Sequence, residues 1–202
     1  MKNIAIFASG RGTNFSAIVK AVKSGALKAN IALLVCDNPK APVLGKARRA
    51  GIKIALIKRE DFSTKKDFES EITGALKKNK IDLIVLAGFM RILSERFVKA
   101  HSGRIINIHP SLLPSFKGTD GIRCAFDYGV KVTGVTVHFV DELMDHGPII
   151  LQAPVKIENH DTLVSLEEKI HKIEHRLYPE AIKLFVEGKL RKEGRRIKVS
   201  HR

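Results

Sequence analysis

The sequence is poor in cysteine and in aromatic residues. Its 202 residues include two cysteines, Cys36 and Cys124, which stand in separate segments with no Cys-x-x-Cys pair or Cys/His cluster. This pattern argues against a disulfide framework and against a zinc site of the usual spacing. We therefore expect both thiols to be buried.

Long apolar runs are also missing, although the hydrophobic fraction of 44% is ordinary for a globular protein. No run approaches the roughly 20 residues that a membrane-spanning helix needs. Met-Lys-Asn-Ile at the N-terminus leads into an apolar strand pattern and not into a signal peptide. We expect a cytoplasmic protein with one domain and at most a small C-terminal appendage.

Acidic residues are scarce, with 21 Asp and Glu against 36 Lys and Arg, which gives a formal net charge of +15. Such a charge is compatible with a nucleic-acid partner or an anionic substrate. From Gly188 onward there are seven basic residues and one acidic residue, but no aromatic side chain for base stacking. We therefore expect a domain over 1–188 and a solvated basic tail over 189–202, and a nucleic-acid partner is the less favoured alternative.

Short apolar runs alternate with segments of helical length and polarity along the first half of the chain. This alternation predicts a doubly wound α/β fold with a mostly parallel, Rossmann-like sheet and right-handed crossovers. The expected strands cover 4–8, 31–35, 54–57, 83–87 and 105–108, and the expected helices cover 15–22, 43–50, 65–78 and 94–100.

The second half predicts two further strands and one long helix. The strands at 133–140 and 149–155 lie too close in sequence for a helix between them, so we expect an antiparallel or loop-linked pair. Apolar residues then recur every three or four positions from Leu163 to Leu177, which is typical of an amphipathic helix that covers a sheet. We expect Pro179 to kink or restart this helix.

Asn107 and His109 form the most informative pair, because they end the predicted strand at 105–108 on one face. A carboxamide can donate an N–H to a developing alkoxide, and an imidazole can add a charged hydrogen bond to the same oxygen. Pro110 ends the strand, so the pair lies at the carboxyl edge where α/β folds bind ligands. The pair therefore predicts acyl-type transfer. The alternative is a purely structural pair whose side chains form hydrogen bonds with backbone groups.

A glycine-containing loop, Ser-Gly-Arg-Gly-Thr-Asn, joins the first predicted strand to the first helix. Gly12, Thr13 and Asn14 would place free backbone N–H groups of a helix N-terminus toward a phosphate. The third glycine of the dinucleotide fingerprint is missing, so we favour a phosphate monoester over a pyrophosphate. Asp37 after the second strand leaves a dinucleotide ribose site open, and a plain strand-to-helix turn needs no ligand.

Two more segments have the composition of a ligand site. Leu-Ala-Gly-Phe-Met-Arg-Ile-Leu, residues 86–93, could wall a pocket for a flat heteroaromatic ring or form an ordinary apolar turn. The loop at 141–148 holds three carboxylates and a histidine, which are also common in solvated turns. We expect Asp145 to pair with His109, since a neighbouring carboxylate favours the charged imidazole.

These motifs, taken in order, resemble those of the phosphoribosylglycinamide formyltransferases, the folate-dependent formyl-transferring enzymes of purine synthesis. The resemblance rests on Gly-x-Gly-Thr-Asn, Leu-Ala-Gly-Phe-Met-Arg-Ile-Leu, Asn-Ile-His-Pro-Ser-Leu-Leu-Pro, Gly-Val-Thr-Val-His-Phe-Val and Asp-His-Gly-Pro-Ile-Ile, and it runs nearly end to end. It implies the formyltransferase version of the fold and 10-formyltetrahydrofolate as co-substrate, with no metal.

The resemblance also implies the roles of individual residues. The catalytic set would be Asn107, His109 and Asp145. The remaining positions would bind substrates: Gly12, Thr13 and Asn14 the phosphate, Glu174 the glycinamide, and Lys65, Met90, Arg91, Ile92, Leu93, Asp141 and Glu142 the folate. Asp120 and Ile122 stand where some members of the family carry histidines.

Related formyl-folate enzymes are the nearest alternatives, because methionyl-tRNA formyltransferase and formyltetrahydrofolate deformylase share the Asn-x-His and Asp pattern. Each carries an additional domain, which the length of this chain does not accommodate, so we expect neither. A non-catalytic nucleotide-binding module on the same fold is the alternative of another class. We expect small-molecule substrates, a monomer or homodimer, and no membrane partner.

Overall fold

The computed structural model describes residues 1–200. The chain divides into two compact units, Met1–Ile106 (unit 1) and the residues from Asn107 onward (unit 2). Seven strands follow the order β3-β2-β1-β4-β5-β6-β7 in one sheet, and two more form a separate hairpin. The mostly parallel, doubly wound α/β fold predicted from the alternating pattern is confirmed.

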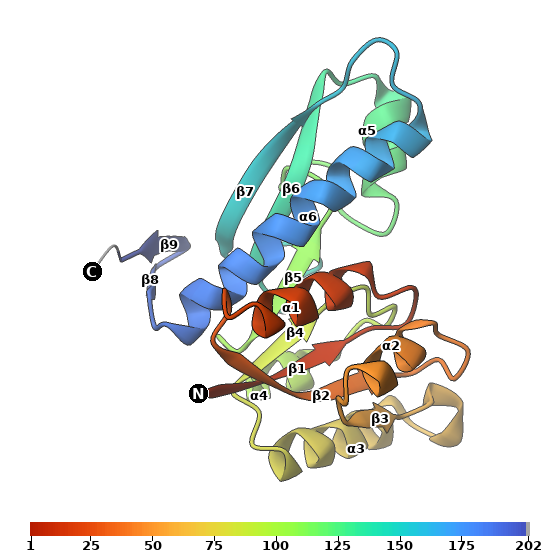
Figure 1. The fold of residues 1–202 in the computed structure, drawn as a ribbon, viewed down its shortest axis with the longest axis vertical. Coiled ribbons are helices and arrows are strands. Elements are labelled where there is room, and N and C mark those ends of the chain that lie inside the picture. The colour runs from red at the N-terminus through yellow and green to blue at the C-terminus, as the bar shows by residue number, and fades with distance from the viewer. Residues whose placement is uncertain (201–202) are drawn as a thin grey trace. The chain divides into compact units, whose positions relative to one another are not determined.

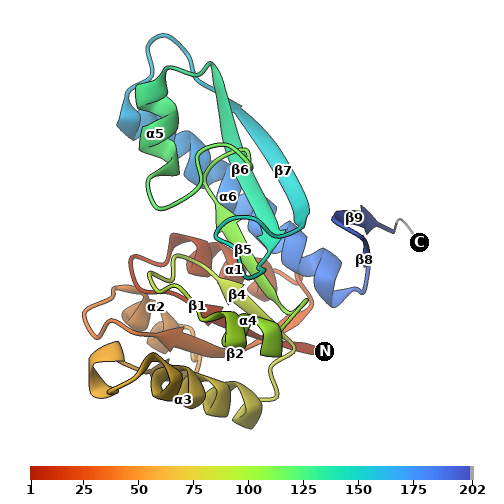
Figure 2. The same cartoon turned by 180° about the vertical axis from the view of Figure 1, so that it is seen from behind.

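Unit 1 contains a parallel sheet in which β1 lies between β2 and β4. Helix α1 lies on one face of this sheet, whereas α3 and α4 lie on the other (Figures 1 and 2). The strands are β1 (Lys2–Phe7), β2 (Ala29–Cys36), β3 (Ile54–Leu56) and β4 (Leu83–Leu86), and the helices are α1 (Thr13–Lys23), α2 (Val43–Arg49), the 3₁₀ turn η1 (Arg59–Asp61), α3 (Lys65–Lys78) and α4 (Glu95–Ala100).

The central strand explains why this sheet forms. Ile4, Ala5, Ile6 and Phe7 of β1 are all fully buried, as expected for a parallel strand covered on both faces. Burying each large apolar side chain stabilises the fold by about 1.5–3 kcal/mol. A shift in the register of β1 would lose this stabilisation, so the register is firmly set. The loops that follow β1 and β4 are thereby fixed at the carboxyl edge.

Unit 2 is built around an antiparallel pair, β6 (Val132–Phe139) and β7 (Ile149–Lys156), covered lengthwise by the long helix α6 (Figure 1). Thr162 caps α6 by accepting a hydrogen bond from the Ser165 backbone N–H at 3.2 Å. The other elements are β5 (Ile105–His109), whose first two residues belong to unit 1, α5 (Gly121–Tyr128), α6 (Leu163–Val186), β8 (Leu190–Glu193) and β9 (Arg196–Val199).

Two expectations about local structure were wrong in part. Helix α6 runs from Leu163 to Val186 through Pro179, so the helix does not restart there. The nearby side chains of Tyr178 and Ala181 are fully buried, and their packing compensates for the hydrogen bond that proline lacks. Cys36 is buried as expected, but Cys124 is exposed. The buried face of α5 is formed by Gly121 and Ala125, and Cys124 lies off that face.

The basic tail is exposed to solvent along most of its described length, as predicted, but it is not a frayed segment. Residues Leu190–Val199 form the β8–β9 hairpin, in which Leu190 pairs with Val199 and Lys192 with Ile197. The last two residues of the predicted tail, 201–202, lie outside the described residues. Within residues 1–200, no helix combines the length and the apolar character needed to cross a membrane.

Candidate active site

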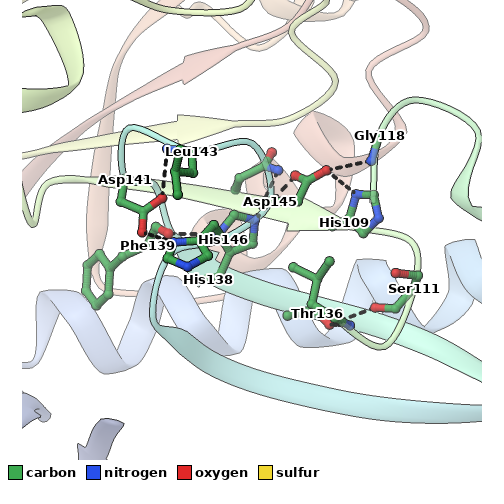
Figure 3. A network of polar contacts seen from close by, with 12 residues as sticks. His109, Ser111, Gly118, Thr136, His138, Phe139, Asp141, Leu143, Asp145 and His146 are labelled. Atoms are coloured by element: carbon green, nitrogen blue, oxygen red, sulfur yellow. Dashed lines mark hydrogen bonds and ion pairs between the residues drawn. The ribbon is translucent and has the colours of Figure 1, made fainter. Parts of the chain in front are cut away.

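Asp145 is the centre of a polar network in unit 2 (Figure 3). Its Oδ2 accepts a hydrogen bond from the Gly118 backbone N–H at 2.8 Å and lies 3.5 Å from His109 Nδ1. Its Oδ1 lies 3.8 Å from His138 Nε2. The side chains of His109 and His138 are almost fully buried, so this carboxylate lies between two imidazoles that have little access to water.

His109, at the end of β5, has a polar neighbour at each ring nitrogen. Nε2 lies 2.8 Å from the Phe116 carbonyl oxygen, which can only accept, so Nε2 carries a proton and donates. Nδ1 faces Asp145 at 3.5 Å, which is longer than an ordinary hydrogen bond. The Nδ1 side is therefore the looser of the two contacts. The predicted pairing of His109 with Asp145 is present.

Asn107 lies two residues earlier on β5 and contacts the same network through His138. Its Nδ2 lies 3.4 Å from His138 Nε2, while His138 Nδ1 lies 2.8 Å from the Phe139 carbonyl oxygen. Burial lowers the pKa of His138, which favours the neutral ring. A neutral ring that donates from Nδ1 leaves Nε2 free to accept from the Asn107 amide, so His138 orients the carboxamide.

The lowered pKa of His138 predicts a pH-dependent stability. The unfolded chain binds this proton more readily than the folded chain, so the contribution is complete above the ordinary pKa of 6.5 and is lost as the pH falls below 6.5 through the folded pKa. We expect His138→Gln to reduce the loss of unfolding free energy between pH 7.5 and 5.5. Urea titrations at both pH values measure this difference.

The matched control is His160→Gln, which changes an exposed loop histidine. The pKa of His101 is lowered by burial and, less strongly, by Arg104 and Lys77, so His101 supplies part of the pH dependence that His138→Gln leaves. An unchanged pH dependence in His138→Gln would contradict the assignment.

Asp145 lies in the loop from Val140 to Pro148, whose two ends are held together by close backbone contacts. Asp145 itself has a φ of 48°, a left-handed conformation that is uncommon for residues other than glycine. The Phe139 N–H donates to the Pro148 carbonyl at 2.9 Å and closes the base of the loop. A Cβ on Gly147 would overlap the Phe139 carbonyl oxygen, so only glycine fits there.

The predicted folate residues of this loop have different surroundings. Asp141 Oδ2 lies 2.7 Å from His146 Nδ1, and its Oδ1 accepts from the Leu143 N–H at 3.2 Å (Figure 3). Glu142 is exposed. Leu143 and Met144 are also exposed, with 62% and 54% of their surface accessible, so this side of the loop offers apolar surface.

The glycine loop of unit 1 requires glycine at one position. Gly12 has a φ of 66°, and a Cβ there would lie 2.5 Å from Val43 Cγ2 of α2. Its carbonyl oxygen accepts from the Lys46 ammonium at 3.2 Å. The loop is therefore held closely against α2.

The N-terminus of α1 directly follows Gly12 and includes Thr13 and buried Asn14. No side chain caps this terminus, and its first turn holds no acidic residue. Its backbone N–H groups and partial positive charge suit an anion, and Lys46 adds a cation beside the loop. The prediction of a phosphate-type loop is compatible with this geometry.

A second polar network ties the ends of β1, β2 and β4 together in unit 1. The Ser9 hydroxyl donates to Asp37 Oδ1 at 2.5 Å and accepts from the Met90 N–H at 2.9 Å. Arg91 Nε lies 2.6 Å from Asp37 Oδ2. Because both oxygens of the buried Asp37 carboxylate are engaged, the dinucleotide-ribose alternative for Asp37 is not supported.

The predicted folate residues of unit 1 therefore separate into two kinds. Arg91 is engaged by Asp37 and helps to hold its loop, whereas Met90 and Ile92 are 70% and 71% exposed and Leu93 is half-buried. Lys65 is exposed at the start of α3 and lines a groove of about 1040 Å³ between α3 and α4.

Two other predicted positions lie in unit 2. Glu174 on α6 is buried, and its Oε2 lies 2.9 Å from Nδ1 of His171, three residues earlier. Asp120 precedes α5 and is exposed, and it accepts a hydrogen bond from the neighbouring Thr119 hydroxyl at 3.4 Å. Neither the Glu174 nor the Asp120 carboxylate is among the groups that contact Asp145 in its network.

Sequence reasoning missed three residues of these networks: His138, Lys46 and Ser9. His138 had a usable signal, because it is the one ionisable residue of strand β6 and lies next to its carboxyl end. Lys46 and Ser9 had none, since their contacts join segments distant in sequence. Among residues 1–200, no group of three or more His, Cys, Asp or Glu is placed to hold a metal ion.

Comparison with known proteins identifies the family. The formyl transferase family model matches residues 2–182. A phosphoribosylglycinamide formyltransferase of Bacillus subtilis is 48% identical over 91% of this chain and 94% of that protein. The trifunctional purine biosynthetic protein adenosine-3 of Gallus gallus is 43% identical over 92% of this chain, which matches 18% of that protein.

A solved structure agrees with these matches. The crystal structure of glycinamide ribonucleotide transformylase 1 from Symbiobacterium toebii has a TM-score of 0.95 and 42% identity, covering 98% of this chain and 94% of that one. The chain therefore belongs to the formyl transferase family, and its predicted resemblance to the phosphoribosylglycinamide formyltransferases is confirmed.

Proposed function

We propose that this protein transfers the formyl group of 10-formyltetrahydrofolate to the amine of glycinamide ribonucleotide in purine biosynthesis. The observation that carries the proposal is the network of unit 2, in which Asp145 lies 3.5 Å from His109 and 3.8 Å from His138, and Asn107 contacts His138 at 3.4 Å. The similarity to phosphoribosylglycinamide formyltransferases along nearly the whole chain supports the same activity. The enzyme is a one-carbon transferase with a folate co-substrate.

The side chains of this network match the charges that formyl transfer develops. Attack of the amine on the formyl carbon forms a C–N bond and places negative charge on the formyl oxygen. Asn107 donates an N–H to that oxygen, and a protonated His109 donates a charged hydrogen bond. Cleavage of the bond from carbon to the folate nitrogen then restores the carbonyl.

Asp145 assists the transfer of a proton from the attacking amine to the departing folate nitrogen. The attacking amine loses a proton, and the departing folate nitrogen gains one, so the reaction needs no net acid or base. The carboxylate lies 3.5 Å from His109 Nδ1 and can organise a water that relays the proton. The left-handed conformation of Asp145 is consistent with a side chain held in position for function.

The remaining site residues bind the two substrates. Backbone N–H groups at Gly12, Thr13 and Asn14 hold the phosphate, with the positive charge of Lys46 beside them. Glu174 binds the glycinamide portion. The folate contacts Lys65, Met90, Ile92, Leu93, Asp141 and Glu142, while Arg91 acts through its ion pair with Asp37.

We further propose that 1–188 form the formyltransferase domain and that 189–202 are an appended segment. The family match over 2–182 and the end of α6 at Val186 support this boundary. We also propose a cytoplasmic monomer or homodimer whose partners are small molecules and not nucleic acid.

Acceptor specificity tests the proposed function. Purified protein is given 10-formyltetrahydrofolate with glycinamide ribonucleotide, initiator methionyl-tRNA or water as the acceptor. We expect rapid transfer to glycinamide ribonucleotide and negligible transfer to the other two. Transfer only to tRNA or to water would favour the methionyl-tRNA formyltransferase or deformylase alternative, and no turnover would favour a binding module.

A further inference from the structure

The hairpin that follows α6 starts from a defined turn. Gly188 has a φ of 69°, its N–H donates to the Phe185 carbonyl at 3.0 Å, and the Lys189 N–H donates to the Leu184 carbonyl at 2.9 Å. These two bonds form a Schellman motif, which ends a helix and reverses the chain. Strand β8 begins at the next residue, so the hairpin has a fixed point of departure.

The tip of the hairpin presents Arg195. Glu193 and Arg196 form the last cross-strand pair, which leaves Gly194 and Arg195 as a two-residue turn. Gly194 has a φ of 58°, as the first central residue of a type II′ turn requires. A tight turn of this kind restricts the backbone that carries Arg195.

Arg195 contacts the loop that carries Asp145. Its Nη2 donates to the His146 carbonyl oxygen at 2.5 Å, and its Nη1 lies 3.2 Å from His146 Nε2. On the other side of the ring, His146 Nδ1 lies 2.7 Å from Asp141 Oδ2. One guanidinium therefore contacts both the backbone and the side chain of the residue next to Asp145.

These contacts determine the tautomer of His146. A guanidinium has only donors, so the contact at Nε2 requires a lone pair on that nitrogen. The proton of the neutral ring then lies on Nδ1 and is donated to Asp141 Oδ2. Arg195, His146 and Asp141 form a chain of hydrogen bonds from the hairpin to the start of the loop.

We propose that Arg195 is a positioning residue that holds the loop at 140–148, and with it Asp145, in the conformation needed for formyl transfer. The inference rests on the proposed function for the role of Asp145. The family model ends at residue 182, so this contact comes from a segment beyond the family match. The basic residues of the tail thus include one that acts on the candidate active site.

Kinetics of Arg195→Ala test the proposal in the full-length enzyme. We expect kcat/KM for 10-formyltetrahydrofolate to fall about tenfold, because a small displacement of a proposed catalytic group is costly. The affinity for glycinamide ribonucleotide, measured calorimetrically without folate, should stay unchanged. Arg195→Lys should recover part of the activity, since an ammonium can still donate to the His146 carbonyl but lacks the planar fork.

The matched control is Arg196→Ala, which removes the exposed arginine that follows Arg195 and begins β9. A second readout does not depend on activity: ¹⁵N shifts of the His146 ring should show the Nδ1–H tautomer in the wild type and a mixture in Arg195→Ala. Equal kinetics and an unchanged tautomer in Arg195→Ala and Arg196→Ala would overturn the proposal. A wild type without formyl transfer would instead overturn the proposed function, and the tautomer result would still test the contact.

Discussion

Alanine at Asn107 or His109 is expected to lower kcat at least about 100-fold, which is the usual cost of losing one donor to an oxyanion. Both side chains are polar and lie at the carboxyl end of β5, outside the apolar core of the sheet, so we expect the fold to persist. Steady-state formyl transfer to glycinamide ribonucleotide measures the loss. Circular dichroism and urea unfolding verify that the variants are folded.

Two controls separate the proposed chemistry from a general effect of losing a polar side chain. Asn30→Ala removes an exposed asparagine of β2, and His160→Ala removes an exposed loop histidine. Both should keep wild-type kcat. Near-normal turnover in Asn107→Ala or His109→Ala would be incompatible with the proposed oxyanion site.

Gly147→Ala is expected to have a comparable effect on activity without touching any proposed catalytic side chain. The new methyl group would overlap the Phe139 carbonyl oxygen and lie 2.8 Å from its carbon, so the base of the loop must move. We expect kcat/KM to fall about 100-fold, since Asp145 is two residues away. Overpacking of this kind should also lower the unfolding free energy by about 1–3 kcal/mol.

Gly74→Ala is the matched control, because the added methyl group has no neighbour within 4 Å. Gly74 lies inside α3, where alanine is favoured over glycine by about 0.5–1 kcal/mol. This variant should keep its activity and unfold at higher urea. If Gly147→Ala retained full activity, Asp145 would not require the observed loop conformation.

The helices and strands in the first half of the chain could be predicted because each is marked by a pattern of neighbouring residues. Strand β1 is an uninterrupted apolar run, and helix α3 begins after a Thr64 cap at the expected residue, Lys65. Helix α5 escaped prediction, since its eight residues start with a glycine and bury only Gly121 and Ala125. The hairpin in the tail was missed because the charge of this segment drew attention to its solvation, whereas Gly188 and Gly194 specify its turns.

In the candidate site, too, residues marked by a local sequence pattern were predicted, whereas contacts between distant segments were not. Asn107, His109 and the Gly12 loop belong to strand ends and turns that a sequence displays directly. The partner of Asn107 is His138, and that of Arg91 is Asp37; both contacts join different strands or loops. The sequence suggested a pocket wall for Arg91 and a ribose contact for Asp37, but it contained no sign that the two side chains bind each other.

The phosphate site proposed at the uncapped start of α1 would link substrate binding to folding. A side-chain cap normally contributes about 1 kcal/mol to a helix, and Gly12 at the N-cap position of α1 has no side chain to supply one. An anion bound there would supply the missing acceptor, so it would also stabilise the helix against unwinding. By mass action, a ligand at 100 times its Kd adds about 2.7 kcal/mol to the unfolding free energy. Substrate supply would then influence not only how fast this enzyme works but also how long each molecule survives proteolysis.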